Sequence, residues 1–361
     1  MAQNVTLMGA SYADVPAVEL PKTGGGTAKF TDTSLTTAEA EDVAEGKVFF
    51  DADGSQQTGT ASGGGNTDIE DAFIKRTITT YENSRVTKIG GHAFAFCYSL
   101  RTASFPLVTD ISYDAFNSCR SLTTISFPLV TYIENSAFAN CYALQSVNFP
   151  ELTSAGIGIF TQCSKLTTVS CPKLSIIGSA MFARCSKLIS VSFPSAIVIN
   201  ISAFANCTSL TTISFSNVTI VGSSAFYFCN MLTDISFPLV NVIHSSAFAY
   251  CSNLTTVSLP LLATIHTNAF GSCANLSTAI FPNLKNIGSS AFYKAYNLIS
   301  LYLPGSYVVS LSAATAFTST PIGGYSVSAG QYGSIYVPES LLSSYKTKTY
   351  WSIYSSRFVG I

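Results

Sequence analysis

The sequence predicts a right-handed solenoid of about ten stacked coils, and a strict internal period is the main reason. A phenylalanine recurs every 22 residues from Phe94 to Phe292. A cysteine stands three residues after each phenylalanine except the last, and a leucine follows three residues after that position. One such unit cannot close a core alone, so it must be buried between two neighbouring units.

The spacing of apolar residues within one unit assigns its inner and outer sides. Leu122, Ile125 and Phe127 follow the L-x-x-L-x-L pattern, and the last two share one side of a strand. Pro128 then ends the strand pairing, because it has no N–H to donate. The segment SAFANC at 136–141 is expected to form one helical turn. We therefore predict a leucine-rich-repeat solenoid with a parallel β-sheet on one side and short helical turns and loops on the other.

The period covers only part of the chain, which divides the sequence into four segments. Residues 1–65 are predicted to form a small β-rich attachment module and linker, with a hairpin turn at Asp53–Gly54. Residues 66–88 are expected to cap the N-terminal end, and residues 89–304 to form the solenoid. Residues 305–361 are expected to form an irregular last coil and a C-terminal cap.

The composition excludes several classes of function. Apolar residues make up 47% of the chain, which is enough for a substantial core. Only 10% of residues are charged and the net charge is −1, so the basic footprint of a nucleic-acid-binding protein is missing. No run approaches the roughly 18 apolar residues of a membrane span. The opening residues MAQNVTLMGASYADVP do not resemble a secretory signal, so we expect folding in the cytoplasm.

Nine of the ten cysteines occupy one equivalent inward position of the repeat. Free cysteine packs as a small apolar residue, so these side chains are expected to form a ladder of buried free thiols. The sequence has no C-x-x-C pair, which argues against a zinc site. The predicted ladder consists of Cys97, Cys119, Cys141, Cys163, Cys185, Cys207, Cys229, Cys251 and Cys273.

The three histidines offer little for catalysis. His244 and His266 are also 22 residues apart, so they should lie one above the other. Such a pair could ligate a metal with one further donor, but the simpler interpretation is two turn residues at the position of Gly222 and Gly288. No carboxylate pair recurs, so no nucleophile, base and orienting group can be assembled. We predict a protein that is not an enzyme and that has no cofactor and no metal.

The predicted surface has a monotonous face and a variable edge. Outward strand positions carry mostly serine and threonine, a pattern that solubility alone explains. The variable positions flank the cysteine, in the turn before each strand. Exposed aromatic side chains there suit stacking on sugar rings or anchoring a protein partner, and packing on the neighbouring coil is the alternative role. The candidate ligand-binding residues are Phe96, Tyr98, Tyr142, Tyr227, Phe228, Tyr250, Tyr293 and Tyr296.

Two resemblances extend this interpretation. The repeats AFANCTSLTTISF at 203–215 and GSSAFYFCNMLTDISFP at 222–238 resemble BspA-like leucine-rich repeats of bacterial surface proteins and microbial adhesins. That family implies extracellular binding without enzymatic activity. The N-terminal segments at 4–32 and 42–60 resemble the start of tail and tail-fibre proteins in phages and prophages of Gram-positive bacteria.

Together the resemblances imply a phage tail receptor-binding protein, as a tail fibre or tail tip, located in the virion. Residues 1–65 would join other tail or baseplate proteins, and the solenoid would recognise a polysaccharide or protein on the host surface. Tail fibres are commonly trimeric, which implies a homotrimer, although the sequence has no coiled-coil heptads. The alternatives are a bacterial cell-surface adhesin and a structural virion spacer. Neither nucleic-acid binding nor membrane insertion is expected.

Overall fold

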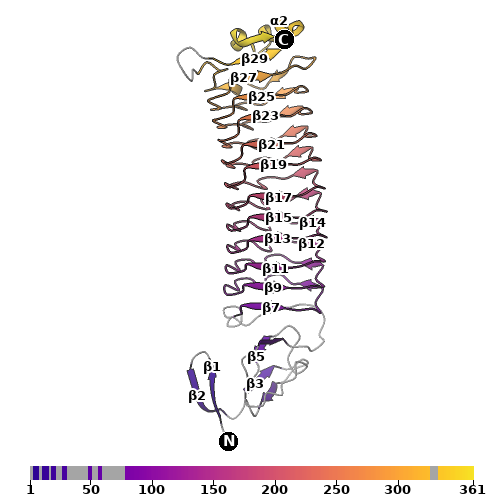
Figure 1. The fold of residues 1–361 in the computed structure, drawn as a ribbon, viewed down its shortest axis with the longest axis vertical. Coiled ribbons are helices and arrows are strands. Elements are labelled where there is room, and N and C mark those ends of the chain that lie inside the picture. Colours follow the sequence, from indigo (N-terminus) through magenta and orange to yellow (C-terminus); the bar gives the residue numbers. More distant parts are fainter. Residues whose placement is uncertain are drawn as a thin grey trace.

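A computed structural model describes six short strands within the first 58 residues, and all of residues 78–325 and 332–361. In the latter two ranges, twelve parallel strands form one face of an elongated column (Figure 1). These strands are β7 (Thr80–Glu82), β9 (Thr102–Ser104), β11 (Thr124–Ser126), β13 (Ser146–Asn148), β15 (Thr168–Ser170), β17 (Ser190–Ser192), β19 (Thr212–Ser214), β21 (Asp234–Ser236), β23 (Thr256–Ser258), β25 (Thr278–Ile280), β27 (Ser300–Tyr302) and β29 (Ser334–Val337).

A second parallel ladder of two-residue strands runs beside the first. Its strands hold the inward residue of the apolar pair that precedes each core phenylalanine, as Ile133 does before Phe138. The strands are β8 (Lys88–Ile89), β10 (Asp110–Ile111), β12 (Tyr132–Ile133), β14 (Ser154–Ala155), β16 (Ile176–Ile177), β18 (Val198–Ile199), β20 (Ile220–Val221), β22 (Val242–Ile243), β24 (Thr264–Ile265), β26 (Asn286–Ile287) and β28 (Ser310–Leu311).

The pairing register equals the repeat period, which confirms the predicted solenoid. Thr124 pairs with Thr102 in the first ladder, and Ile133 pairs with Ile111 in the second. The predicted number of about ten coils is too low, because strands β7 and β29 extend the first ladder at its two ends. The sequence period does not extend to either of the two end coils. The first has Tyr81 in its strand and no phenylalanine–cysteine pair before it, and the last follows an insertion.

The SAFANC segment forms consecutive hydrogen-bonded turns, so the predicted helical turn is wrong. Ser136 and Asn140 have φ of 56° and 62°, which a right-handed helix does not allow. The N–H groups of Ser136, Phe138 and Asn140 donate to carbonyls of the next coil at 2.8–2.9 Å. The turn segment is therefore a third backbone ladder, which satisfies amide groups that the two sheets leave unpaired.

Columns of stacked aromatic rings fill the core. The Phe204 ring is fully buried, with centroids 5.3 Å from Phe182 and 5.2 Å from Phe226. The column of stacked rings extends beyond the last residue of the sequence period. Phe317, which lies 25 residues beyond Phe292, stacks on it at 5.5 Å. The column therefore continues through the insertion although the spacing in the sequence changes.

The C-terminal elements cover the last phenylalanine of the column. Trp351 is fully buried 5.9 Å from Phe317, and its Nε1 donates to the carbonyl of Val309 at 2.7 Å. The Val309 N–H in turn donates to the hydroxyl of Tyr345 at 3.0 Å. These elements are η2 (Ala314–Phe317), η3 (Glu339–Leu341), α2 (Leu342–Thr347), η4 (Ser352–Arg357) and β30 (Phe358–Gly360), which pairs in parallel with β29.

The N-terminal strands pair differently from those of the solenoid. They form three antiparallel pairs, as expected of a β-rich module. The predicted turn at Asp53–Gly54 lies between the paired strands β5 and β6 but outside the described residues. The strands are β1 (Gln3–Leu7), β2 (Ala10–Val15), β3 (Val18–Pro21), β4 (Thr27–Phe30), β5 (Val48–Phe50) and β6 (Gln56–Thr58).

Phe204→Ala should lower the free energy of unfolding by about 3–5 kcal/mol, because the cavity would lie between two stacked coils that cannot collapse independently. Chemical denaturation followed by circular dichroism measures this loss. The control Thr212→Ala, at an exposed position of β19, should change stability by less than about 0.5 kcal/mol. Equal losses in the two variants would contradict the stacked-ring core.

Candidate ligand-binding edge

In each turn segment, the residue two positions after the core phenylalanine has a left-handed backbone. Its φ lies between 58° and 65° throughout the ten units of the sequence period. Its N–H donates to the next coil, as that of Tyr250 does to Gly271 at 2.8 Å. These edge positions are Phe96, Ser118, Asn140, Gln162, Arg184, Asn206, Phe228, Tyr250, Ser272 and Lys294.

Aromatic residues at this position oppose the preference of the backbone. A left-handed conformation costs an ordinary residue about 1–2 kcal/mol, and asparagine and glycine tolerate it best. Phe96, Phe228 and Tyr250 nevertheless occupy it, and 53%, 40% and 43% of their surface remain exposed. Strained residues of this kind motivate a hypothesis of function.

Three of the eight predicted ligand-binding residues, with Arg120, form an N-terminal cluster. The Phe96 and Tyr98 rings lie 6.2 Å apart. The Arg120 guanidinium lies 5.0 Å from the Tyr98 ring and 5.9 Å from the Tyr142 ring, which belong to the coils on either side. These cation–π contacts hold the side chains in place across three coils.

Three more predicted residues form a middle cluster. Tyr227 and Phe228 share one coil, and Tyr250 lies on the next. The Tyr250 centroid is 5.3 Å from that of Tyr227 and 6.0 Å from that of Phe228. The middle cluster is separated from the N-terminal one by coils whose edge positions hold Gln162, Arg184 and Asn206, so the eight residues do not form one unbroken aromatic surface.

The last two predicted residues lie around a lysine at the edge position, in what we call the lysine cluster. Lys294 Nζ lies 5.1 Å from the Tyr293 ring. A side-chain hydrogen bond with Tyr293, together with the charges that Tyr293, Tyr296 and Tyr250 carry when ionised, raises the pKa of Lys294. The Tyr296 ring lies 5.4 Å from Tyr325. The sequence analysis missed Tyr325, because it follows the point where the period slips.

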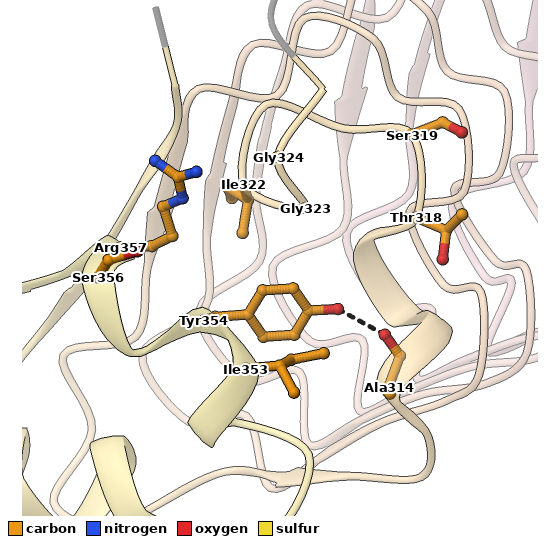
Figure 2. A pocket seen from close by; sticks show the side chains of 10 residues that line it. All are labelled: Ala314, Thr318, Ser319, Ile322, Gly323, Gly324, Ile353, Tyr354, Ser356 and Arg357. Carbon is orange, nitrogen blue, oxygen red and sulfur yellow. Dashed lines mark hydrogen bonds between the residues drawn. The ribbon is translucent and has the colours of Figure 1, made fainter.

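A cleft of about 330 Å³ adjoins the lysine cluster at the C-terminal end of the solenoid. Figure 2 shows Arg357 and Thr318 on opposite sides of it, with Tyr354 between them. The Tyr354 hydroxyl donates to the carbonyl of Ala314 at 2.6 Å, which anchors this ring, and burial raises its pKa. No repeating signal marks these residues, so the sequence analysis could not find the cleft.

The predicted cysteine ladder is present as buried free thiols. The thiols do more than fill space. Each Sγ from Cys119 to Cys273 donates to the carbonyl of the core phenylalanine in the preceding coil, as Cys207 does to Phe182 at 3.2 Å. Burial raises the pKa of Cys163, Cys229 and Cys273 to about 12. These neutral thiols serve the fold and offer no nucleophile.

The two histidines stack as the period predicts. The rings of His244 and His266 are 4.8 Å apart and only 12° from parallel. Burial, and then the neighbouring His266, lower the pKa of His244. Nitrogen lone pairs lie in the ring planes, so nearly parallel rings do not point at one shared ion. In residues 78–325 and 332–361, no group of three or more His, Cys, Asp or Glu side chains could hold a metal.

A known family of repeat proteins matches most of this sequence. The family described as "BspA type Leucine rich repeat region" matches residues 70–189, 175–299 and 219–327, more than half of the sequence. The chain belongs to the BspA-type leucine-rich repeat family. No curated protein matches the sequence.

Several solved structures are similar to this BspA-type solenoid. A leucine-rich cell surface protein from Faecalibacterium prausnitzii is 20% identical, with a TM-score of 0.42, and the match covers 87% of this chain and 96% of that one. The leucine-rich repeat protein of T. pallidum is 26% identical, with a TM-score of 0.40 and coverage of 50% and 78%. In the described part of this chain, no helix has the length and apolar character needed to cross a membrane.

The cysteine ladder predicts an alkaline loss of stability. Unfolded thiols ionise near their ordinary pKa of 9.0, whereas Cys163, Cys229 and Cys273 hold their protons to about pH 12. The unfolded state therefore loses protons first, and the free energy of unfolding should fall as pH rises above about 9. Urea unfolding between about pH 8 and pH 11 measures the slope. The triple alanine variant at these positions should show a shallower fall, and an equal slope would contradict the role of the thiols.

Tyr250→Asn should leave the stability unchanged or raise it by up to about 1 kcal/mol, because asparagine relieves the left-handed backbone. The reverse change Asn206→Tyr, at the same position of another coil, should lower stability by about 1 kcal/mol. Thermal unfolding of both variants checks the pair. A loss of more than about 1 kcal/mol in Tyr250→Asn would mean that this ring is retained for packing on the neighbouring coil.

Proposed function

We propose that this chain is a non-catalytic adhesin, displayed on a bacterial surface, that binds its ligand along the aromatic edge of the solenoid. The observation that carries the proposal is the set of exposed aromatic side chains at strained edge positions, above all Phe228 and Tyr250. Rigid aromatic groups with a polar rim are typical binding anchors. Membership of the BspA-type family supports a surface-binding role.

A phage tail receptor-binding protein is the second candidate, and a structural feature favours it. Three antiparallel strand pairs precede the parallel solenoid, and they belong to the region whose sequence resembles tail proteins. In this role residues 1–65 attach to the tail or baseplate, and the edge binds a host polysaccharide or protein. The resemblance to tail fibres implies that the chain forms a homotrimer. Immunogold labelling separates the candidates: label on phage tails supports the virion role, and label on intact cells without a prophage supports the adhesin.

Binding by the edge is tested with intact bacterial cells and the purified full-length chain. The triple variant Tyr227→Ala, Phe228→Ser and Tyr250→Asn should reduce cell binding by at least about 10-fold, because it removes the whole middle cluster. Flow cytometry over a concentration series measures the apparent affinity.

The matched control changes the same edge position in coils where that position is not aromatic, as Gln162→Ser, Arg184→Asn and Asn206→Ser. Cell binding should remain within about 2-fold of the unsubstituted chain, since surface changes away from an anchor are nearly neutral. If the chain binds cells and the middle-cluster variant binds them equally well, the edge is not the binding site. If the chain binds no cells, the result favours a structural spacer.

A further inference from the structure

The charge of the chain is distributed unevenly along the solenoid. The sequence contains no aspartate or glutamate between Asp234 and Glu339, although Lys285 and Lys294 lie in that segment. After Asp234 the chain carries five basic residues and the single acid Glu339. Cations therefore outnumber carboxylates over the C-terminal coils, and the resulting potential favours an anionic partner.

Lys294 brings one of these cations to the aromatic edge. Its ammonium lies 5.1 Å from the centre of the Tyr293 ring, and the charges of Tyr296 and Tyr250 when ionised would raise its pKa. Lys294 occupies a left-handed edge position with φ of 58°, two coils beyond Tyr250. A charged group among several aromatic hydroxyls can meet an anion while the neighbouring rings contact apolar sugar faces.

The edge and the cleft are joined through the backbone. The Lys294 N–H donates to the carbonyl of Thr318 at 3.1 Å, and Thr318 lines the cleft. Tyr325, which touches Tyr296, directly follows Gly324, another lining residue. The middle cluster, the lysine cluster and the cleft thus lie along one side of consecutive coils.

The cleft offers the same chemistry as the lysine cluster. Its cation is Arg357, whose guanidinium lies 4.1 Å from the centre of the Tyr332 ring. Figure 2 shows the hydroxyls of Thr318 and Ser319 on the side opposite Arg357. An arginine fork recognises carboxylate or phosphate in two hydrogen bonds. At about 330 Å³, the cleft is at the small end of ligand sites, so it suits one unit of a larger molecule.

The geometry points to an anionic glycan as the ligand, bound with its sugar rings along the middle and lysine clusters and one acidic unit in the C-terminal cleft. This inference rests on the proposed surface-binding function and names the class of ligand. A row of rings interrupted by two cations matches a polymer that alternates apolar sugar faces with acidic groups. Uronic-acid polysaccharides and glycosylated polyol-phosphate wall polymers share this chemistry.

The test measures binding of the full-length chain to polygalacturonate, to its neutral methyl-esterified form, and to glycosylated poly(ribitol phosphate). At least one acidic polymer should bind about 10-fold or more tightly than the neutral one, and its affinity should fall with added salt. The tighter acidic polymer identifies carboxylate or phosphate as the source. Equal binding of charged and neutral polymers, or binding of neither acidic polymer, would overturn the inference. Polyglutamate is included, and if it binds as tightly as the better acidic glycan, the ligand is an acidic peptide instead.

Two variants locate the site. Lys294→Gln and Arg357→Gln should each lower the affinity for the better acidic polymer by about 3- to 10-fold and reduce its salt dependence. The control is Lys285→Gln. Lys285 is exposed, lies in the same coil as Lys294 and belongs to none of the clusters. Removing its charge should change the affinity by less than about 2-fold. An equal loss in the control would mean that net charge alone attracts the polymer. Thermal unfolding of each variant establishes that the fold is intact, and Arg357→Lys, which keeps the charge, should retain more affinity than Arg357→Gln.

Competition on cells separates this inference from the proposed function. If the acidic polymer displaces the chain from bacterial cells, both stand. If the chain binds cells through the aromatic edge and no acidic polymer competes, the glycan inference fails and the surface-binding function remains. If the chain binds neither cells nor polymers, both fail.

Discussion

Stacking of one coil on the next at a fixed register is the constraint on which the rest of this structure depends. Three backbone ladders hold each coil to its neighbour: two sets of parallel strands and the alternating hydrogen bonds of the turn segment. Because the register never shifts through the ten units of the sequence period, each core side chain meets its own equivalent above and below. A core position therefore favours side chains that pack well on copies of themselves, which flat phenylalanine rings and small thiols do.

The same constraint explains why the turn position is informative. The backbone there is left-handed in every one of these units, because the turn must reverse direction while its N–H reaches the next coil. Asparagine at Asn140 and Asn206 satisfies that geometry at low cost. Phenylalanine and tyrosine at the same position are costly and exposed. An aromatic residue at the edge position therefore carries a backbone cost, and a binding role supplies a physical reason for keeping these rings.

The two ends of the solenoid differ in chemistry as well as in structure. Near the N-terminal cluster both cations and acids are present, with Arg120 among tyrosines and Asp114 accepting a hydrogen bond from Asn117. Toward the C-terminal end Glu339 is the single acidic side chain after Asp234, and the edge leads to a cleft that contains Arg357. Along the edge, the charge changes from mixed near the N-terminal cluster to positive near the C-terminal cleft. This difference would orient a long anionic ligand along the coils.

The repeating parts of this protein follow from the sequence by itself. The period assigns the coil length, the inward phenylalanine and cysteine columns and the stacked histidines, since a fixed register turns sequence spacing into spatial neighbourhood. Tertiary structure decided what the period does not encode. The turn segment became a third ladder because alternate N–H groups in it find their partners in the next coil. Two end coils appeared where their residues depart from the consensus, and Phe317 joined the column across an irregular spacing. Tyr325 reaches Tyr296 and Arg357 reaches the cleft from segments without any repeat, so only the folded chain brings them into place.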